Sequence, residues 1–100
     1  MTDGHIRVEL QRSGGFTGLR RCATMDSDEL PEEDARQLRV LVDVLDLQAL
    51  QHVRSDHRLP ALDLTIVRGS ERVQATLDES TVPAELRPLI QLLDQRAQPC

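Results

Sequence analysis

The sequence is poor in aromatic residues and has no lysine. Phe16 is the only aromatic among 100 residues, and neither Trp nor Tyr occurs. Any core must therefore be packed from aliphatic side chains, mostly Leu and Val. All 12 basic residues are arginines, and 17 acidic residues give a net charge of −5. Because nucleic acids require a basic surface, this charge argues against a nucleic-acid partner.

Long apolar segments are also missing. No run of 18 apolar residues is present, so we expect no membrane-spanning helix. The first ten residues, MTDGHIRVEL, lack the basic start and apolar stretch of a signal peptide. The expected location is the cytoplasm, with export alongside a target protein as the alternative. A chain of this length predicts a single domain spanning residues 1–100.

The two cysteines, Cys22 and Cys100, are too few for a disulfide framework. Cys22 lies within a predicted strand, and Cys100 ends the chain in a tail that we expect to be mobile. This pattern predicts one thiol near the core and one incidental exposed thiol.

Four segments alternate apolar and polar residues, which is typical of half-buried strands. They cover approximately residues 5–11, 19–25, 63–67 and 72–78. Clean alternation leaves one face of the sheet in water, which favours antiparallel pairing. Glycine-containing segments, at Gly14-Gly15 and at Gly69-Ser70, supply turns within the two predicted hairpins.

Two segments show helical spacing. Pro31 is suited to the first helical position, and the acidic residues that follow it suit a helix N-terminus. The apolar stripe of this helix consists of Ala35, Leu38, Leu41, Val42 and Leu45.

Residues 46–52 allow one further helical turn. A closing helix from about Pro83 buries Leu86, Leu89, Ile90 and Leu93, and Pro88 should make its first turn irregular. The predicted fold is α+β, in the order ββαββα. It is a two-layer sandwich of a four-stranded antiparallel sheet with both helices on one face.

The sequence from Arg12 to Gly18, RSGGFTG, precedes four further segments that occur in a recognisable order. These are LPEEDARQLRVLVDVLDLQAL (30–50), DLTIV (63–67), RVQATLD (72–78) and VPAELRPLIQLL (82–93). In this order the chain resembles the emfourin family, small bacterial inhibitors of thermolysin-like zinc metalloproteases. The resemblance implies a non-catalytic protein that reversibly blocks the cleft of such a protease. It also implies no cofactor, and we expect a monomer in the free state.

The proteases that this resemblance implies hold a zinc ion in a cleft and prefer a bulky apolar residue after the cleaved bond. Asp28, Glu29 and Leu30 together offer two carboxylates, which are possible zinc ligands, beside an apolar side chain. The residue before a proline favours an extended conformation, so we expect an extended binding segment here. The alternative is that Leu30 packs onto the first turn of the helix as a hydrophobic staple.

A second candidate contact is the glycine-rich loop. Gly14, Gly15 and Phe16 offer an aromatic ring beside a backbone that can approach a partner closely. The alternative is that Phe16 folds back onto the core, as lone aromatic residues usually do. We rank the Leu30 segment slightly above this loop, and both could touch the enzyme.

The sequence offers no pattern for catalysis or for metal binding. His5, His52 and His57 lack the HExxH spacing, and no CxxC pair is present. Ser13 lies before two glycines without the GxSxG context of a nucleophile. We therefore expect neither an enzyme nor a metal site. The alternative to inhibition is a small cytoplasmic interaction module, or a protease partner without inhibitory activity.

Overall fold

The computed structural model describes residues 5–13, 20–51, 61–78 and 82–99. The elements, in chain order, are β1 (Ile6–Ser13), β2 (Arg21–Asp26), α1 (Glu32–Asp43), α2 (Leu47–Leu50), β3 (Ala61–Arg68), β4 (Glu71–Asp78), the 3-10 turn η2 (Ala84–Leu86), α3 (Arg87–Asp94) and β5 (Gln98–Pro99). Within these ranges no helix is long and apolar enough to cross a bilayer.

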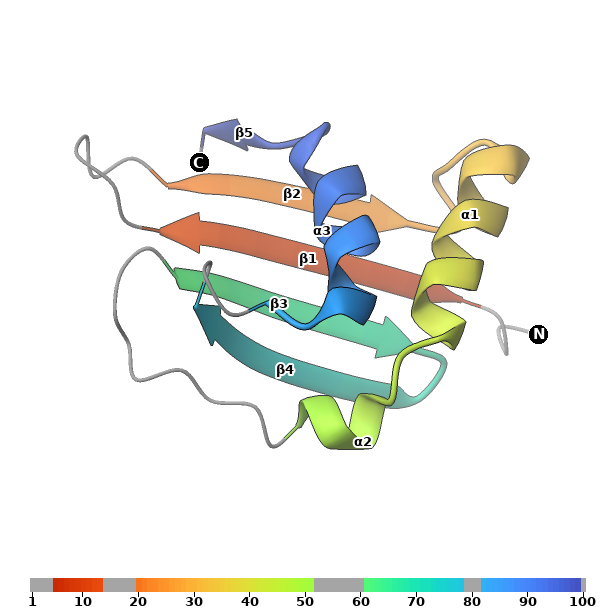
Figure 1. Cartoon of the computed structure of the whole chain (residues 1–100). Coiled ribbons are helices and arrows are strands. Elements are labelled where there is room, and N and C mark those ends of the chain that lie inside the picture. Colours follow the sequence, from red (N-terminus) through yellow and green to blue (C-terminus); the bar gives the residue numbers. More distant parts are fainter. Residues whose placement is uncertain (1–4, 14–19, 52–60, 79–81, 100) are drawn as a thin grey trace.

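The strands form one antiparallel sheet in the order β4-β3-β1-β2-β5. Helices α1 and α3 cross the same face of this sheet (Figure 1). The predicted α+β class, the antiparallel pairing and the helices on one face are therefore confirmed.

The prediction of four strands in the order ββαββα is wrong in detail. A fifth strand, β5, pairs Gln98 with Cys22 and Pro99 with Arg21 at the edge of β2. Two residues are too short to show alternation, so no sequence pattern marks this strand. The pairing also shows that residues 98–99 are attached to the sheet, contrary to the expectation of a mobile tail.

The core lies between the helices and one face of the sheet. Alternate strand residues face it, and neighbouring strands match in register, as in the row Met25, Val8, Ile66 and Val73. The predicted helical stripe is largely confirmed, because Leu38, Val42 and Leu45 are buried. Leu41 and Ala35 are only partly buried and lie at the edge of this stripe.

The buried side chains of the described residues are all aliphatic or methionine. They are Ile6, Val8, Leu10, Ala23, Met25, Leu38, Val42, Leu45, Leu47, Leu50, Leu62, Leu64, Ile66, Val73, Ala75, Leu77, Leu86, Leu89, Ile90 and Leu93. On the other face of the sheet Glu9, Gln11, Thr24, Asp63 and Gln74 are partly or fully exposed.

Both helix starts depend on proline. Pro31 is the N-cap of α1 rather than its first residue, a shift of one position. Pro88 is at the first or second position of α3, where the missing N–H removes no helical hydrogen bond. The predicted irregularity is present as the 3-10 turn η2, which precedes α3.

The sheet has two ends that matter for function. At the Asp26 end, β1 begins and β2 ends. The turn between β3 and β4 lies at the same end and contains Gly69, which has a φ of 61°. At the Ser13 end, Ser13 lies opposite Ala61, and Ala61 lies opposite Asp78. Three connections of the chain, residues 14–19, 52–60 and 79–81, therefore join the described strands at this second end.

Candidate functional site

The segment from Asp26 to Leu30 is a hydrogen-bonded turn and not the expected extended stretch. The carbonyl of Asp26 accepts from the N–H groups of Glu29 and Leu30 at 3.0 and 3.1 Å. Ser27 donates its N–H to the carbonyl of Ile6, and the N–H of Ile6 donates to the Ser27 hydroxyl. A local hydrogen-bond network thus folds this segment into a turn.

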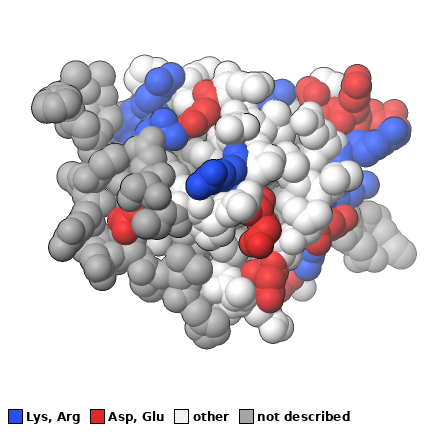
Figure 2. All heavy atoms as spheres, viewed as in Figure 1, with Lys and Arg blue, Asp and Glu red and all other residues white. Residues whose placement is uncertain are grey.

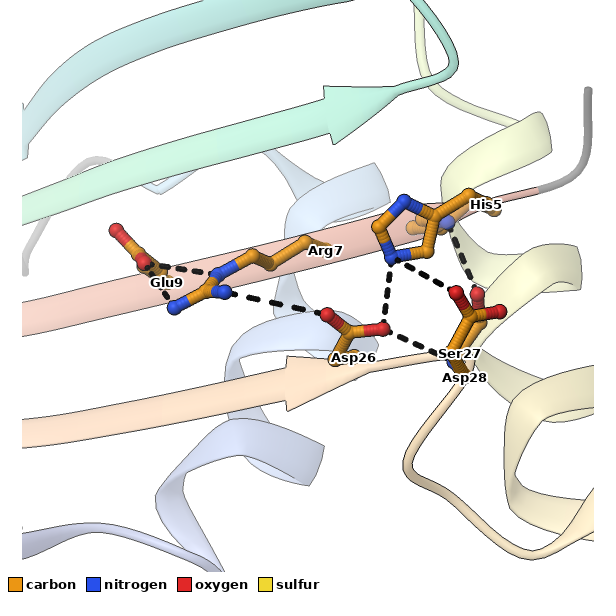
Figure 3. Close-up of polar contacts among 7 residues, drawn as sticks. His5, Arg7, Glu9, Asp26, Ser27 and Asp28 are labelled. Atoms are coloured by element: carbon orange, nitrogen blue, oxygen red, sulfur yellow. Dashed lines mark hydrogen bonds and ion pairs between the residues drawn. The ribbon is translucent and has the colours of Figure 1, made fainter. Parts of the chain in front are cut away.

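Three polar side chains meet at the base of this turn (Figure 3). Nε2 of His5 lies 2.8 Å from Oδ1 of Asp26 and 3.6 Å from Oδ2 of Asp28. The same Oδ1 accepts the backbone N–H of Asp28 at 2.9 Å. We call this group the His5 cluster, meaning His5, Asp26 and Asp28.

The sequence analysis missed the His5 cluster. His5 and Asp26 are separated by 21 positions, and no motif links a histidine to a carboxylate at such a distance. The pairing of β1 with β2 brings them together, since Arg7 lies opposite Asp26. The signal that could have found the cluster is the hairpin register, which puts the start of β1 beside the end of β2.

The hydrogen bonds at Asp26 stabilise its charged form. The backbone N–H of Asp28 is the main cause that lowers the pKa of Asp26 below 3.8, and His5 and Arg7 add to the effect against the opposing cost of burial. Arg7 itself is turned toward Glu9, which its guanidinium contacts at 3.0 Å, and it lies 4.0 Å from Asp26. The turn is therefore held by an ionised carboxylate.

Leu30 is partly buried and packs against the core. It also lines a surface hollow of about 420 Å³ with Ser27, Ala35 and residues of the first turns of α1. Leu30 precedes the N-cap, and Ala35 is four positions into the helix, which is the geometry of a hydrophobic staple. The alternative stated from the sequence, a packing role for Leu30, thus has direct support in the geometry.

The carboxylates of Asp28 and Glu29 are exposed to solvent, unlike the side chain of Leu30. The side chain of Asp28 is 71% exposed although it contacts His5, and Glu29 is exposed. Acidic side chains continue into the first turn of α1, at Glu32, Glu33 and Asp34, and red atoms gather over this helix in Figure 2. The turn therefore offers negative charge to a partner more readily than an apolar anchor.

The second set of predicted contact residues, Gly14, Gly15 and Phe16, lies outside the described residues. Among the described residues, a hollow lies next to Arg12 near the end of β1. This hollow of about 200 Å³ is lined by Leu62, Val82 and Ile90 together with Arg12, Arg87 and Gln91. Arg12 also forms an ion pair of 2.9 Å with Asp94 of α3.

The two predicted contact regions adjoin opposite ends of β1 and β2. Residues 14–19 connect to β1 and β2 at the Ser13 end, whereas Asp26–Leu30 follows β2 at the opposite end (Figure 1). Eight residues of β1 separate these ends, a span of roughly 23 Å at the usual rise of a strand. Contact of both regions with one enzyme therefore stays a prediction.

Cys22 corrects a further expectation. It is disulfide-bonded, and the only other cysteine of the chain is Cys100, which lies outside the described residues. The predicted free thiol at Cys22 is therefore wrong. The pairing of β5 with β2 explains why, because it sets Gln98 opposite Cys22.

One of the comparisons with known proteins identifies a family for this chain. The family model for Emfourin matches residues 10–94. The chain belongs to the Emfourin family. No curated protein and no solved structure matches it. The predicted resemblance is thus confirmed by a match that includes β2, β3, β4 and all of the helices. Emfourin is an inhibitor family, which suggests a role in inhibiting a metalloprotease.

Proposed function

We propose that this protein is a reversible, non-catalytic inhibitor of a thermolysin-like zinc metalloprotease. The observation that carries the proposal is the family match over residues 10–94. The proposed partner is a protease of the same bacterium, bound by a single domain that is monomeric when free.

For the contact with the protease we propose the Ser13 end, with Phe16 as the apolar anchor. Leu30, which the sequence analysis ranked first, is partly buried against the core and so has less side chain to offer a cleft. Three connections of the chain meet the sheet at the Ser13 end. Interfaces concentrate their free energy in a few apolar anchors, and the sequence Gly14-Gly15-Phe16 supplies one aromatic side chain next to two glycines. The turn with Asp28 and Glu29 is the alternative contact.

The experiment is a titration of a purified thermolysin-like protease with the protein, measured by hydrolysis of a fluorogenic peptide. We expect activity to fall to zero at stoichiometric excess and to recover on dilution, while the protein remains uncleaved on a gel. A serine protease assayed in parallel should keep its activity. If the protein binds the protease without reducing its activity, it is a non-inhibitory protease partner and not an inhibitor.

The redox state of Cys22 in cells tests where the protein is located. A disulfide persists in oxidising compartments, whereas thiols of the cytosol are kept reduced. Thiol labelling of the protein in whole cells, compared with labelling after reduction, therefore distinguishes the cytoplasm from export alongside the target. Full labelling before reduction would support the cytoplasm.

A further inference from the structure

The His5 cluster combines one imidazole nitrogen with two carboxylate oxygens. Within the described part of the chain, these three ligand atoms lie within 4.8 Å of one another. Imidazole nitrogen and carboxylate oxygen are the ligands that bind Zn²⁺ outside cysteine-rich sites. Ca²⁺ and Mg²⁺ prefer six or more oxygen ligands, and an imidazole is a poor match for either ion.

The separations of the ligand atoms are close to those that a tetrahedral ion needs. Bonds of about 2.1 Å place the ligand atoms of a tetrahedral zinc ion about 3.4 Å apart. The Nε2 of His5 is 2.8 Å from the Asp26 oxygen and 3.6 Å from the Asp28 oxygen. These two separations lie on either side of the one that a tetrahedral ion needs.

The charge and exposure of the cluster also favour a cation. Two carboxylates face one imidazole, and the nearest arginine, Arg7, is held by Glu9 at 3.0 Å and is 4.0 Å from Asp26. The side chain of Asp28 is 71% exposed and that of His5 is 29% exposed, so an ion can reach both from solvent. Asp26 is 10% exposed and keeps the N–H of Asp28 as a hydrogen-bond donor, which fixes its orientation as a supporting contact would in a metal site.

The geometry points to a Zn²⁺ site formed by His5, Asp26 and Asp28, with water completing a tetrahedral shell. A bound ion would connect the start of β1 to the turn that follows β2. This inference rests on the cluster alone and not on the proposed inhibition, so either can fail without the other.

Isothermal titration of the untagged protein with ZnCl₂, in a buffer that does not bind zinc, tests the site. We expect one ion per chain, and His5→Gln and Asp28→Asn should each weaken binding by at least tenfold, as loss of metal-site contacts usually does. Both changes are close in size to the original residues, and Gln at position 5 can still donate to Asp26. The nitrogen shifts of the His5 ring should show that Nε2 is the atom that binds.

The matched control is the double variant His52→Gln, His57→Gln, which removes the other two histidines of the chain. It should bind Zn²⁺ as the parent does, and MgCl₂ should give no binding to either protein. The inference is overturned if the folded parent takes up no zinc at about 1 mM. It is equally overturned if His5→Gln and Asp28→Asn bind as well as the parent.

Discussion

The Asp26 end and the Ser13 end of the sheet are built in different ways. At the Asp26 end the connections are short, and hydrogen bonds hold the residues between Asp26 and Leu30. The turn that contains Gly69 lies at the same end, and the N–H of Gly69 donates to the carbonyl of His5 at 3.0 Å. At the Ser13 end, β1, β3 and β4 each adjoin a connection that contains residues outside the described ranges, namely 14–19, 52–60 and 79–81.

This difference supports the proposal of the Ser13 end as the protease contact, although the sequence alone ranks the Leu30 segment slightly above the glycine-rich loop. The polar groups of the Asp26 end already bond to one another, and Leu30 packs against the core, so we propose that this end contributes mainly to stability. The Ser13 end combines glycine-rich sequence with a hollow that is lined by arginines as well as by Leu62 and Ile90. Binding residues are commonly found on such connections, which a rigid scaffold positions.

The largest expected effect is on the core that both ends share. Leu38 of α1 is fully buried, whereas Leu41 of the same helix is only partly buried. Leu38→Ala should lower the free energy of unfolding by about 2–5 kcal/mol, and Leu41→Ala by clearly less. Urea denaturation followed by circular dichroism measures both. Equal losses would mean that the face of α1 that packs on the sheet is assigned wrongly.

The second-largest expected effect is on inhibition, and it distinguishes the Ser13 end from the Asp26 end as the protease contact. Phe16→Ala should weaken inhibition by at least tenfold, equivalent to about 1.4 kcal/mol. Leu30→Ala should leave the inhibition constant within a few-fold of the parent but should lower the free energy of unfolding by about 1 kcal/mol, because it removes part of a staple. Inhibition constants and urea midpoints of the two variants test the pair. If Leu30→Ala instead abolishes inhibition while Phe16→Ala retains it, the contact lies at the Asp26 end.

The difference between local patterns and long-range contacts explains which features could be predicted from the sequence. Alternation within β1, β3 and β4 predicted which side chains are buried, for example Val8, Leu64 and Leu77, because period-two burial is a local property of a strand. The His5 cluster and β5 depend on which strands pair and in which register. Such long-range contacts leave no trace in the spacing of single residues. The packing of Leu30 was only one of two alternatives, since the same leucine suits a staple and a cleft.

A smaller effect concerns the carboxylate that holds the turn at the Asp26 end. Asp26→Asn keeps an oxygen that can accept the N–H of Asp28 but loses the charge, so we expect a loss of about 1 kcal/mol at neutral pH. The folded protein lowers the pKa of Asp26 below 3.8. The stabilisation by the charged group is therefore complete well above pH 3.8 and is lost as the pH falls through the lowered pKa.

Urea denaturation of parent and Asp26→Asn at a series of pH values measures this contribution. The stabilities of the two proteins should differ at pH 7 and converge in acid, below pH 3.8. Asp63→Asn is a suitable control, because Asp63 is an exposed carboxylate of β3 whose contact is the hydroxyl of Thr76 at 3.1 Å. A difference for Asp26→Asn that persists unchanged in acid would show that the loss does not come from its charge.

The smallest expected effects are those of the exposed carboxylates in the turn. Asp28→Ala and Glu29→Ala should each change the inhibition constant by less than about threefold, since exposed charges at the rim of an interface mainly tune association rates. Their expected effect on stability is within about 0.5 kcal/mol, as is usual for surface positions. Measurements at low and high salt separate an effect on association rate from a direct contact. If either variant instead loses as much inhibition as Phe16→Ala, and the loss does not depend on salt, the carboxylate binds the zinc of the protease. The proposed contact would then move from the Ser13 end to the Asp26 end.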